Sequence, residues 1–560
     1  MMEKYIQDWI NLDPDPTTKA YLQQLLDKKQ TEQLEHIFSG RLQFGTAGIR
    51  GVVGAGPTQM NRLVIQQTTV GIAHYIKRCF PDDLKAGIII GFDSRTDSKQ
   101  FAMDAAEVLC AHDIHVHFID FYTPTPLIPF GVVQLKCLAG IMITASHNPP
   151  QYNGYKFYWQ DGAQINTEHI TQIQSLIEQQ AAFPAPKIEF EKAQKQNRLS
   201  LLDHSFFQSY KQHIMLSPFL KHAQLPDNIS LAYTALHGVG TEMTQALLHD
   251  LDVKSCYYVT TQCEPDGTFP TLSNPNPENA ESFTEVIKTA KEKDCLLAIA
   301  HDPDADRFRV AAQTEHHEYQ ILTGDQIGCL IADHLLSQQH KKQQMVGTTI
   351  VSSSMLEKIA KQYKANFYKT LTGFKWLAQH AMDQQNHKVQ FLFAYEEALG
   401  YMFGHQIWDK DGLCALAVFL DLCASLDDKK QSIWQKLEQM YRKHDLHMHQ
   451  QATLPLDAQS KDLIHQLRAL EHYDLEDDPL VSYQDLQDDP LFTCDALIFQ
   501  YEHVRVILRM SGTEPKIKCY YEWAQPIHEK IHFLSMQDIT AKKLNAFVEK
   551  HQAFLKSIGN

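Results

Sequence analysis

The sequence lacks long apolar runs and closely spaced cysteines. No hydrophobic stretch approaches the ~18 residues that a membrane-spanning helix needs, and the acidic first segment does not combine a basic region with an apolar core as a signal peptide would. The 11 cysteines include no Cys-x-x-Cys motif. Many of them lie in apolar segments, which is typical of reduced thiols buried in a core. We therefore expect a soluble, cytoplasmic protein.

An excess of positive charge is also missing. The formal net charge of -16 argues against general affinity for nucleic acid or for an anionic membrane, although local cations could still bind a small anionic substrate. The 29 histidines are scattered. Their tightest cluster, His444, His447 and His449, is interpreted as a solvated helix end rather than a metal site, because no cysteine or acidic residue lies at ligand spacing. No segment marks an oligomer interface, so monomer and dimer both stay open.

Hydrophobic strands alternate with helical segments over most of the 560 residues, a pattern typical of mostly parallel sheets covered on both faces. The pattern restarts twice, and the last part has closely spaced strands followed by a helix. We predict an α/β fold: three successive α/β domains with mixed, mostly parallel sheets and a C-terminal α+β domain, arranged around a central cleft. The expected domains are residues 1–205, 206–318, 319–445 and 446–560.

A serine lies where a buried strand is expected to end. Residues 138–143 are mostly apolar, and a polar loop from Thr144 to Pro149 follows them. Ser146 is thus placed at the carboxyl end of a strand, where open α/β sheets bind their ligands. It could carry a phosphoryl group, act as a hydrolase nucleophile or serve only in the turn. The hydrolase alternative is disfavoured because a Gly-x-Ser-x-Gly motif is missing.

Three aspartates alternate after another expected strand. In extended backbone, Asp302, Asp304 and Asp306 would project to one side, and carboxylates crowded in this way suit a hard cation such as Mg²⁺. An EF-hand is excluded because its sixth and twelfth positions would hold Arg307 and Gln313 instead of Gly and Glu. An acidic surface turn is the alternative. We expect Arg307 to contact a phosphoryl group beside the metal.

Two further loops have the composition of ligand sites. The segment from Arg509 to Lys516 combines hydroxyls, a glycine and cations, which suits a phosphate, with a plain hairpin turn as the alternative. The segment from Glu396 to Gly400 offers carboxylate acceptors for sugar hydroxyls, and Lys410 follows closely. A phosphorylatable serine, a metal triplet, an acceptor-rich loop and a cationic loop are the parts that phosphoryl transfer within a sugar phosphate needs. A metal-dependent phosphatase that uses an aspartate and a sugar-phosphate-binding regulator are the rival hypotheses.

The chain resembles the α-D-phosphohexomutase superfamily, in particular the phosphoglucomutases of its longer, phosphopentomutase-related branch. The motifs that carry the resemblance span essentially the whole chain in the family's order: Phe44–Gly51, Thr144–Pro149, Asp302–Arg307, Gly373–Lys375 and Arg509–Lys516.

The resemblance implies a role for each matching residue. Ser146 would be the phosphoserine and would complete the Mg²⁺ shell with Asp302, Asp304 and Asp306. The reaction centre would include Arg50, His147 and Lys156, with Lys156 as a candidate general acid or base. Sugar or phosphate would be bound by Lys375, Glu396, Lys410, Arg509, Ser511, Gly512 and Thr513. The composition of the motifs adds Arg307 and a lysine, Lys516 or Lys518, to the expected substrate-binding residues.

The resemblance also implies an activity on small-molecule sugar phosphates. The expected reaction interconverts glucose 1-phosphate and glucose 6-phosphate, with Mg²⁺ as cofactor and glucose 1,6-bisphosphate as activator and intermediate. A hinged fourth domain would open and close. Many hexose mutases carry Glu-x-Ser in the sugar loop, whereas Ala398 stands at the third position here. The missing hydroxyl removes a hydrogen bond worth roughly 0.5–1.5 kcal/mol, so phosphomannomutase and phosphopentomutase activity stay as alternatives.

Overall fold

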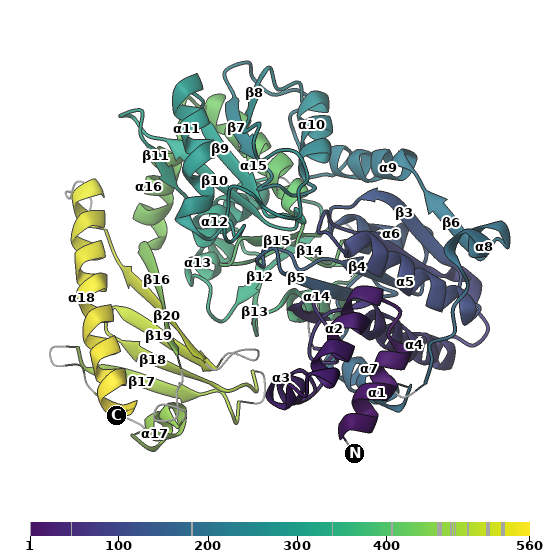
Figure 1. Ribbon diagram of the computed structural model, residues 1–560. Helices are drawn as coiled ribbons and strands as arrows, with labels where there is room; N and C mark the ends of the chain where they lie inside the picture. The colour runs from purple at the N-terminus through teal and green to yellow at the C-terminus, as the bar shows by residue number, and fades with distance from the viewer. Residues whose placement is uncertain are drawn as a thin grey trace.

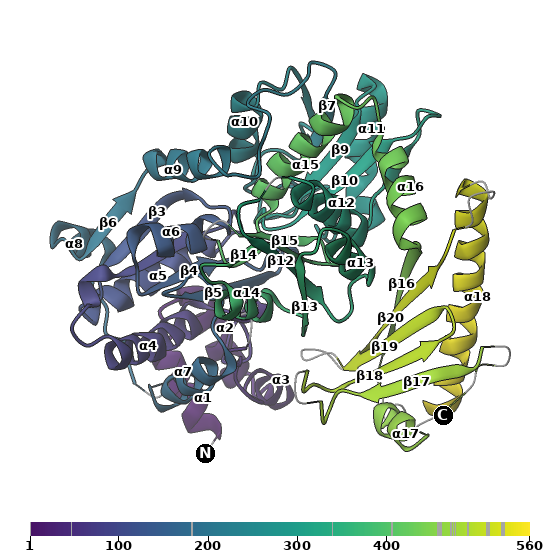
Figure 2. The same cartoon turned by 180° about the vertical axis from the view of Figure 1, so that it is seen from behind.

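The computed structural model places four β-sheets one after another along the chain, and Figures 1 and 2 show them from opposite sides. Three helices precede the first sheet: α1 (Met2–Leu12), α2 (Pro16–Asp27) and α3 (Thr31–Ile37). None of the described helices is both long and apolar enough to cross a membrane. The structure describes residues 2–45, 48–180, 183–338, 340–404, 407–455, 462–470, 473, 475, 478–489, 492–510, 516–527 and 533–559.

The first sheet has six strands in the order β1-β5-β4-β2-β3-β6. Its strand β2 is buried along its whole length, as a parallel sheet covered on both faces requires. Strand β5, which we did not predict, follows the serine loop directly and runs antiparallel to β1 and β4. The strands are β1 (Ile49–Val52), β2 (Ile88–Phe92), β3 (Val116–Tyr122), β4 (Ala139–Ile143), β5 (Tyr152–Trp159) and β6 (Leu199–Leu202). The helices are α4 (Arg62–Cys79), α5 (Ser98–Ala111), α6 (Leu127–Leu135), α7 (Thr167–Gln180), α8 (Phe190–Lys195) and α9 (His204–Met215).

The second and third sheets are also mixed, with strand orders β11-β10-β9-β7-β8 and β13-β12-β14-β15. The second unit contains β7 (Ser230–Thr234), α10 (Thr241–Asp250), β8 (Ser255–Tyr258), α11 (Thr284–Lys293), β9 (Leu297–His301), β10 (Phe308–Gln313) and β11 (Tyr319–Ile321). The third contains α12 (Gly324–Leu336), β12 (Gln343–Thr349), α13 (Met355–Gln362), β13 (Asn366–Thr370), α14 (Phe374–Gln384), β14 (Val389–Glu396), β15 (Gly400–Phe403), α15 (Gly412–Asp427) and α16 (Ile433–His444).

The fourth sheet is antiparallel throughout, in the order β16-β20-β19-β18-β17, and α18 covers one of its faces (Figure 1). The predicted fold class is therefore confirmed. The predicted domain boundaries at residues 205, 318 and 445 stay predictions.

The fourth unit contains β16 (Leu446–Pro455), α17 (Leu463–Leu470), β17 (Leu480–Asp485), β18 (Ala496–Tyr501), β19 (Val504–Met510), β20 (Lys516–Gln525) and α18 (Phe533–Gly559).

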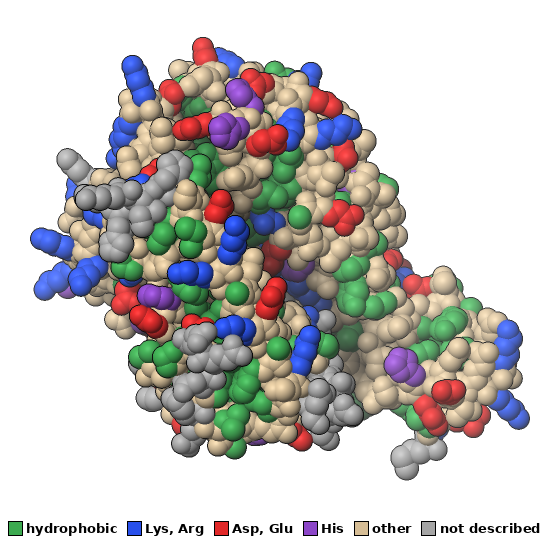
Figure 3. Space-filling model, turned by 90° about the vertical axis from the view of Figure 1, so that its left-hand side faces the viewer, with side chains coloured by type: hydrophobic (Ala, Val, Ile, Leu, Met, Phe, Trp, Pro, Cys, Tyr) green, Lys and Arg blue, Asp and Glu red, His purple; other side chains and the backbone are tan. Residues whose placement is uncertain are grey.

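The hydrophobic cores show how the units are joined. The largest apolar cluster connects α9 with the second and third units, through side chains such as Tyr210, Leu231 and Phe393. The fourth unit has a core of its own, and it meets the third unit at a smaller apolar cluster that includes Ile350 and Ile507. Figure 3 shows a hollow between the lobes of the molecule, in which acidic and basic side chains gather.

Candidate active site

Ser146 lies at the end of β4 and faces the aspartate segment of the second unit. Its Oγ is 2.9 Å from Asp302 Oδ2 and 3.2 Å from His147 Nδ1. The Thr144 hydroxyl accepts a hydrogen bond from the Ser146 amide at 2.8 Å, and Ser146 has a positive φ of 53°. This left-handed backbone is uncommon for serine, and the turn uses it to direct the side chain toward Asp302.

Arg95 holds the serine loop in place, and the sequence analysis did not identify it as a site residue. The buried guanidinium donates to the carbonyls of Ser146 at 2.7 Å and Asn148 at 2.6 Å, and to those of Pro149 and Tyr152 at 2.8 Å. A signal was present, because Arg95 follows β2, the strand next to β4. The carboxyl ends of neighbouring parallel strands meet at one sheet edge.

The aspartate triplet converges, but not for the predicted reason. Asp302, Asp304 and Asp306 are fully buried, and one oxygen of each lies within 4.8 Å of the others. The segment is a tight turn rather than extended backbone. Ala305 has a φ of 55°, and its amide donates to the Asp302 carbonyl at 2.9 Å. The predicted alternative, an acidic surface turn, is wrong because all three carboxylates lie in the interior.

Two lysines neutralise part of this charge. Lys156, on β5, lies 2.6 Å from Asp304 Oδ2 and 2.7 Å from Asp306 Oδ2, and Lys410 Nζ lies 3.0 Å from Asp306 Oδ2. Burial and the neighbouring carboxylates raise the pKa of Asp302 well above its ordinary value. Burial also opposes ionisation of Asp304, but the Lys156 ammonium outweighs it and lowers the pKa of Asp304 overall. Lys410 therefore contacts the aspartate cluster, and its expected contact with sugar or phosphate stays a prediction.

The donor set fits a small divalent cation. Asp304 Oδ1 and Asp306 Oδ1 are buried and have no hydrogen-bond partner among the described residues. Buried carboxylate oxygens are seldom left unpaired, and an all-oxygen set of ligands suits Mg²⁺. The triplet is the only group of potential metal-binding side chains with suitable spacing in the described part of the chain.

Three other predicted residues surround the serine. Arg50 donates to Asn148 Oδ1 at 3.1 Å, and Arg307 donates to Glu278 Oε1 at 2.6 Å. The Nε atoms of both arginines are buried without a hydrogen-bond partner among the described residues, which leaves donors for an anion. Burial, followed by the charges of Arg307 and Arg50, holds the pKa of His147 well below its ordinary value. The imidazole is therefore neutral near pH 7.

The sugar loop is the turn between β14 and β15. Glu396 accepts a hydrogen bond from the Gly373 amide at 2.5 Å, and Lys375 beside it is buried, which lowers the pKa of the lysine. Glu397 was not singled out by the sequence analysis. Its Oε2 accepts a hydrogen bond from Ser352 Oγ at 3.0 Å. Burial and the charge of Glu396 raise the pKa of Glu397 to about 7.

The tail loop reaches toward the third unit. The Arg509 guanidinium, at the end of β19, donates to the Thr372 hydroxyl, close in sequence to Gly373 and Lys375. Burial and the charge of Arg509 lower the pKa of Lys518, which pairs with Arg509 across β19 and β20. Lys516 begins β20. The predicted residues Ser511, Gly512 and Thr513 lie outside the described residues.

Known protein families match the chain in the order of its sheets. The family described as phosphoglucomutase/phosphomannomutase, alpha/beta/alpha domain I, matches residues 41–183, and domains II and III of the same family match residues 206–315 and 323–444. These matches cover more than half of the chain. The chain therefore belongs to the phosphoglucomutase/phosphomannomutase family, within the α-D-phosphohexomutase superfamily. It is accordingly a phosphotransferase enzyme of the mutase type.

Individual relatives carry several names. The chain is 33% identical over 554 residues to a probable phosphoribomutase of Schizosaccharomyces pombe, with 93% of each chain covered. It is 32% identical over 462 residues to glucose 1,6-bisphosphate synthase of Mus musculus, which covers 80% of this chain and 74% of that protein. The open form of the Paramecium phosphoglucomutase parafusin has a TM-score of 0.72 and 19% identity, over 93% of this chain and 96% of that chain. The last likeness supports the fold alone.

Proposed function

We propose that the protein is a Mg²⁺-dependent phosphoglucomutase that interconverts glucose 1-phosphate and glucose 6-phosphate through a phosphoserine at position 146. One observation carries the proposal: Ser146 Oγ lies 2.9 Å from Asp302 in a buried cluster of three carboxylates. A structural serine in a turn would not need this neighbourhood. Asp302, Asp304, Asp306 and the Ser146 side chain would hold the cation, which would offset negative charge on the transferring group.

In the first transfer, the bond between phosphorus and Ser146 Oγ breaks, and a bond forms to a hydroxyl oxygen of the bound sugar phosphate. The sugar hydroxyl loses its proton to a base, and Oγ regains one. In the return transfer to Ser146, neutral His147, 3.2 Å from Oγ, can accept the proton of the serine hydroxyl. The Lys156 ammonium is the proposed donor within the carboxylate cluster. The product is a bound glucose 1,6-bisphosphate, which reverses its orientation and returns its other phosphate to Ser146.

The remaining proposed residues bind the substrate at its far end. Glu396 and Lys375 would bind sugar hydroxyls or phosphate, and Arg509, Lys516 and the loop between them would bind the phosphate that is not transferred. Binding the distant phosphate supplies orientation at the reacting end. Arg307 and Arg50 would contact the transferring phosphoryl group, consistent with their unpaired Nε donors among the described residues.

Phosphopentomutase activity is the second candidate, because the relative of Schizosaccharomyces pombe is named a probable phosphoribomutase. Ala398 also lacks the hydroxyl of the hexose-mutase Glu-x-Ser motif. Phosphomannomutase activity is the weaker alternative and rests on the family description. A cytoplasmic location and a monomeric or dimeric state are further parts of the proposal.

The test is steady-state kinetics with Mg²⁺ and glucose 1,6-bisphosphate on glucose, mannose and ribose 1-phosphates. The proposal predicts the highest kcat/KM for glucose 1-phosphate, with no net release of inorganic phosphate. A higher value for ribose 1-phosphate would replace the primary function by the second candidate. Stoichiometric release of phosphate would favour the phosphatase hypothesis, and tight binding without turnover would favour the regulator.

A further inference from the structure

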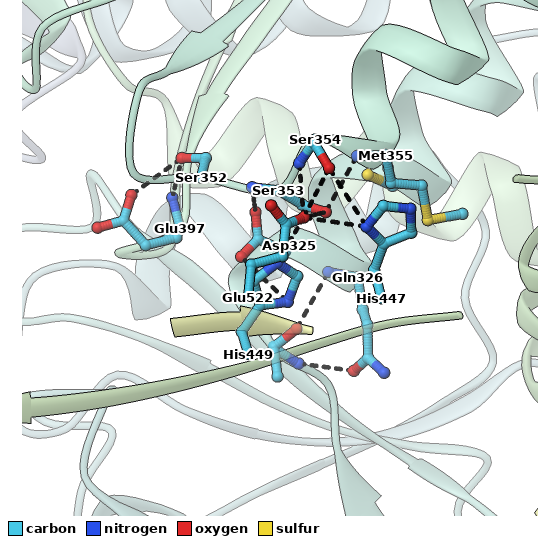
Figure 4. Close-up of polar contacts among 12 residues, drawn as sticks. Asp325, Gln326, Ser352, Ser353, Ser354, Met355, Glu397, His447, His449 and Glu522 are labelled. Carbon is cyan, nitrogen blue, oxygen red and sulfur yellow. Dashed lines mark hydrogen bonds and ion pairs between the residues drawn. The ribbon is translucent and has the colours of Figure 1, made fainter. Parts of the chain in front are cut away.

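A buried carboxylate joins the fourth unit to the third. Glu522, on β20, is 4% exposed. Its Oε1 accepts hydrogen bonds from the Ser353 hydroxyl at 3.0 Å, the Ser354 amide at 2.7 Å and the Ser354 hydroxyl at 3.0 Å (Figure 4). Ser354 is the N-cap of α13, so a carboxylate of the fourth unit lies at the amino end of a helix of the third, where the helix dipole favours negative charge.

Side chains of its own sheet complete the environment of Glu522. His449 on β16 and Arg505 on β19 are its direct cross-strand neighbours, at 3.2 Å and 2.7 Å, and His447 lies 3.0 Å away. Burial alone would raise the pKa of Glu522, but Arg505 and the two histidines lower it well below its ordinary value. Our interpretation of the histidine cluster as a solvated helix end is therefore wrong. His444 and His447 are buried, and the acidic partner lies 75 residues away from His447.

The segment that contains Ser353 and Ser354 also contacts the sugar loop, residues 396–400. Ser352 Oγ donates to Glu397 Oε2 at 3.0 Å and accepts from the Glu397 amide at 3.2 Å (Figure 4). The Ser352 carbonyl accepts from Arg505 at 2.7 Å, and the Ile350 carbonyl accepts from the same guanidinium at 3.2 Å. Residues 350–354 thus form a connecting loop. Glu522 and Arg505 of the fourth unit bind this loop on one side, and Ser352 in the loop binds Glu397 on the other.

We propose that Glu522 is a positioning residue for sugar binding: through the connecting loop it fixes Glu397 and thereby the shape of the sugar loop. This inference rests on the proposed function, because it assumes that the loop from Glu396 to Gly400 binds the sugar. Packing of the fourth unit against the third would then also position Glu397 in the sugar site. If Glu522 only stabilised the contact between the two units, its bonds to Ser353 and Ser354 would be sufficient. The two hydrogen bonds between Ser352 and Glu397 extend the contact to the sugar loop.

Affinity measured without turnover tests the proposal. Isothermal titration of glucose 1-phosphate and ribose 1-phosphate into a Ser146→Ala background excludes chemistry from the readout. Glu522→Gln keeps the shape but removes the charge, and Ser352→Ala removes the Oγ contacts with Glu397 and with the Thr349 hydroxyl, which lies 2.8 Å away. Each is expected to weaken binding by about tenfold to a hundredfold, the range of a charge-assisted hydrogen bond. Glu502→Gln, an exposed carboxylate in the same unit, is the matched control and should bind normally.

A double-mutant cycle separates positioning from stability. If the two residues act along one path, Glu522→Gln combined with Ser352→Ala binds about as weakly as the worse single variant. Fully additive losses, or unchanged affinity in the Ser352→Ala variant, would overturn the inference and leave the proposed function intact. A lower melting temperature with unchanged affinity in Glu522→Gln would do the same. If the protein without these substitutions binds neither sugar phosphate, the proposed function and the inference both fail.

Discussion

Replacing Arg95 by lysine is expected to misplace the serine loop while keeping a positive charge beside Asp93. The arginine supplies the loop with four hydrogen bonds at 2.6–2.8 Å. Lysine presents three donors from a single nitrogen rather than a planar fork, so at least one of these four buried or part-buried carbonyls loses its donor. An unsatisfied buried acceptor costs about 1–3 kcal/mol, and we expect a decrease of that size in the free energy of unfolding.

The effect on catalysis should be larger than the effect on stability suggests, because a displacement of ~1 Å at a reacting group can cost about a hundredfold in rate. Urea unfolding measures the change in the free energy of unfolding, and a coupled mutase assay measures the change in kcat. Arg62→Lys is the control. Arg62 on α4 forms a bidentate ion pair with Asp104 on α5, at 2.7 and 2.8 Å, and no hydrogen bond joins it to the serine loop in the described part of the chain. A kcat for Arg95→Lys equal to that of Arg62→Lys would refute the reasoning.

Two further predictions concern the metal and pH. Mg²⁺ should raise the melting temperature, since a ligand at one hundred times its Kd stabilises the folded state by about 2.7 kcal/mol. Asp304→Asn should abolish the increase, whereas Asp252→Asn, at a partly exposed carboxylate outside the site, should not. An equal response in both variants would contradict the site. Glu397 has a folded pKa of about 7, above its ordinary 4.5, so its burial costs stability that is absent below pH 4.5 and complete above pH 7. Glu397→Gln should therefore gain stability relative to the unmodified protein as pH rises through this window, and a pH-independent difference in unfolding free energy would contradict the prediction.

Local patterns were enough to predict the fold class and much of the site. Ser146 and the aspartates both follow short apolar strands, and the carboxyl ends of such strands are where α/β sheets bind ligands. The two strands, β4 and β9, lie in different sheets, so the contact between Ser146 and Asp302 depends on how the first two units pack. The conformation of the aspartate segment was not predictable in this way, because Ala305 adopts a left-handed backbone that its residue type does not signal.

Contacts between distant segments were also beyond the sequence patterns. Lys410 contacts Asp306 across the boundary between the second and third sheets. His447 and His449 are adjacent to a helix end in sequence, but β16 pairs with β20 and brings them to Glu522. Partners of this kind depend on strand order, which hydrophobic periodicity does not specify. Arg95 was identifiable in principle, because it follows a strand as Ser146 does.

The covalent role of Ser146 is tested most directly by peptide mass spectrometry after incubation with glucose 1,6-bisphosphate and Mg²⁺, paired with turnover of the Ser146→Ala variant. We predict one phosphoryl group on Ser146 in the unmodified protein, and neither labelling nor mutase turnover in the variant. A phosphoryl group on Asp302 instead, or full turnover by Ser146→Ala, would contradict the proposal that this serine gives and receives the phosphate.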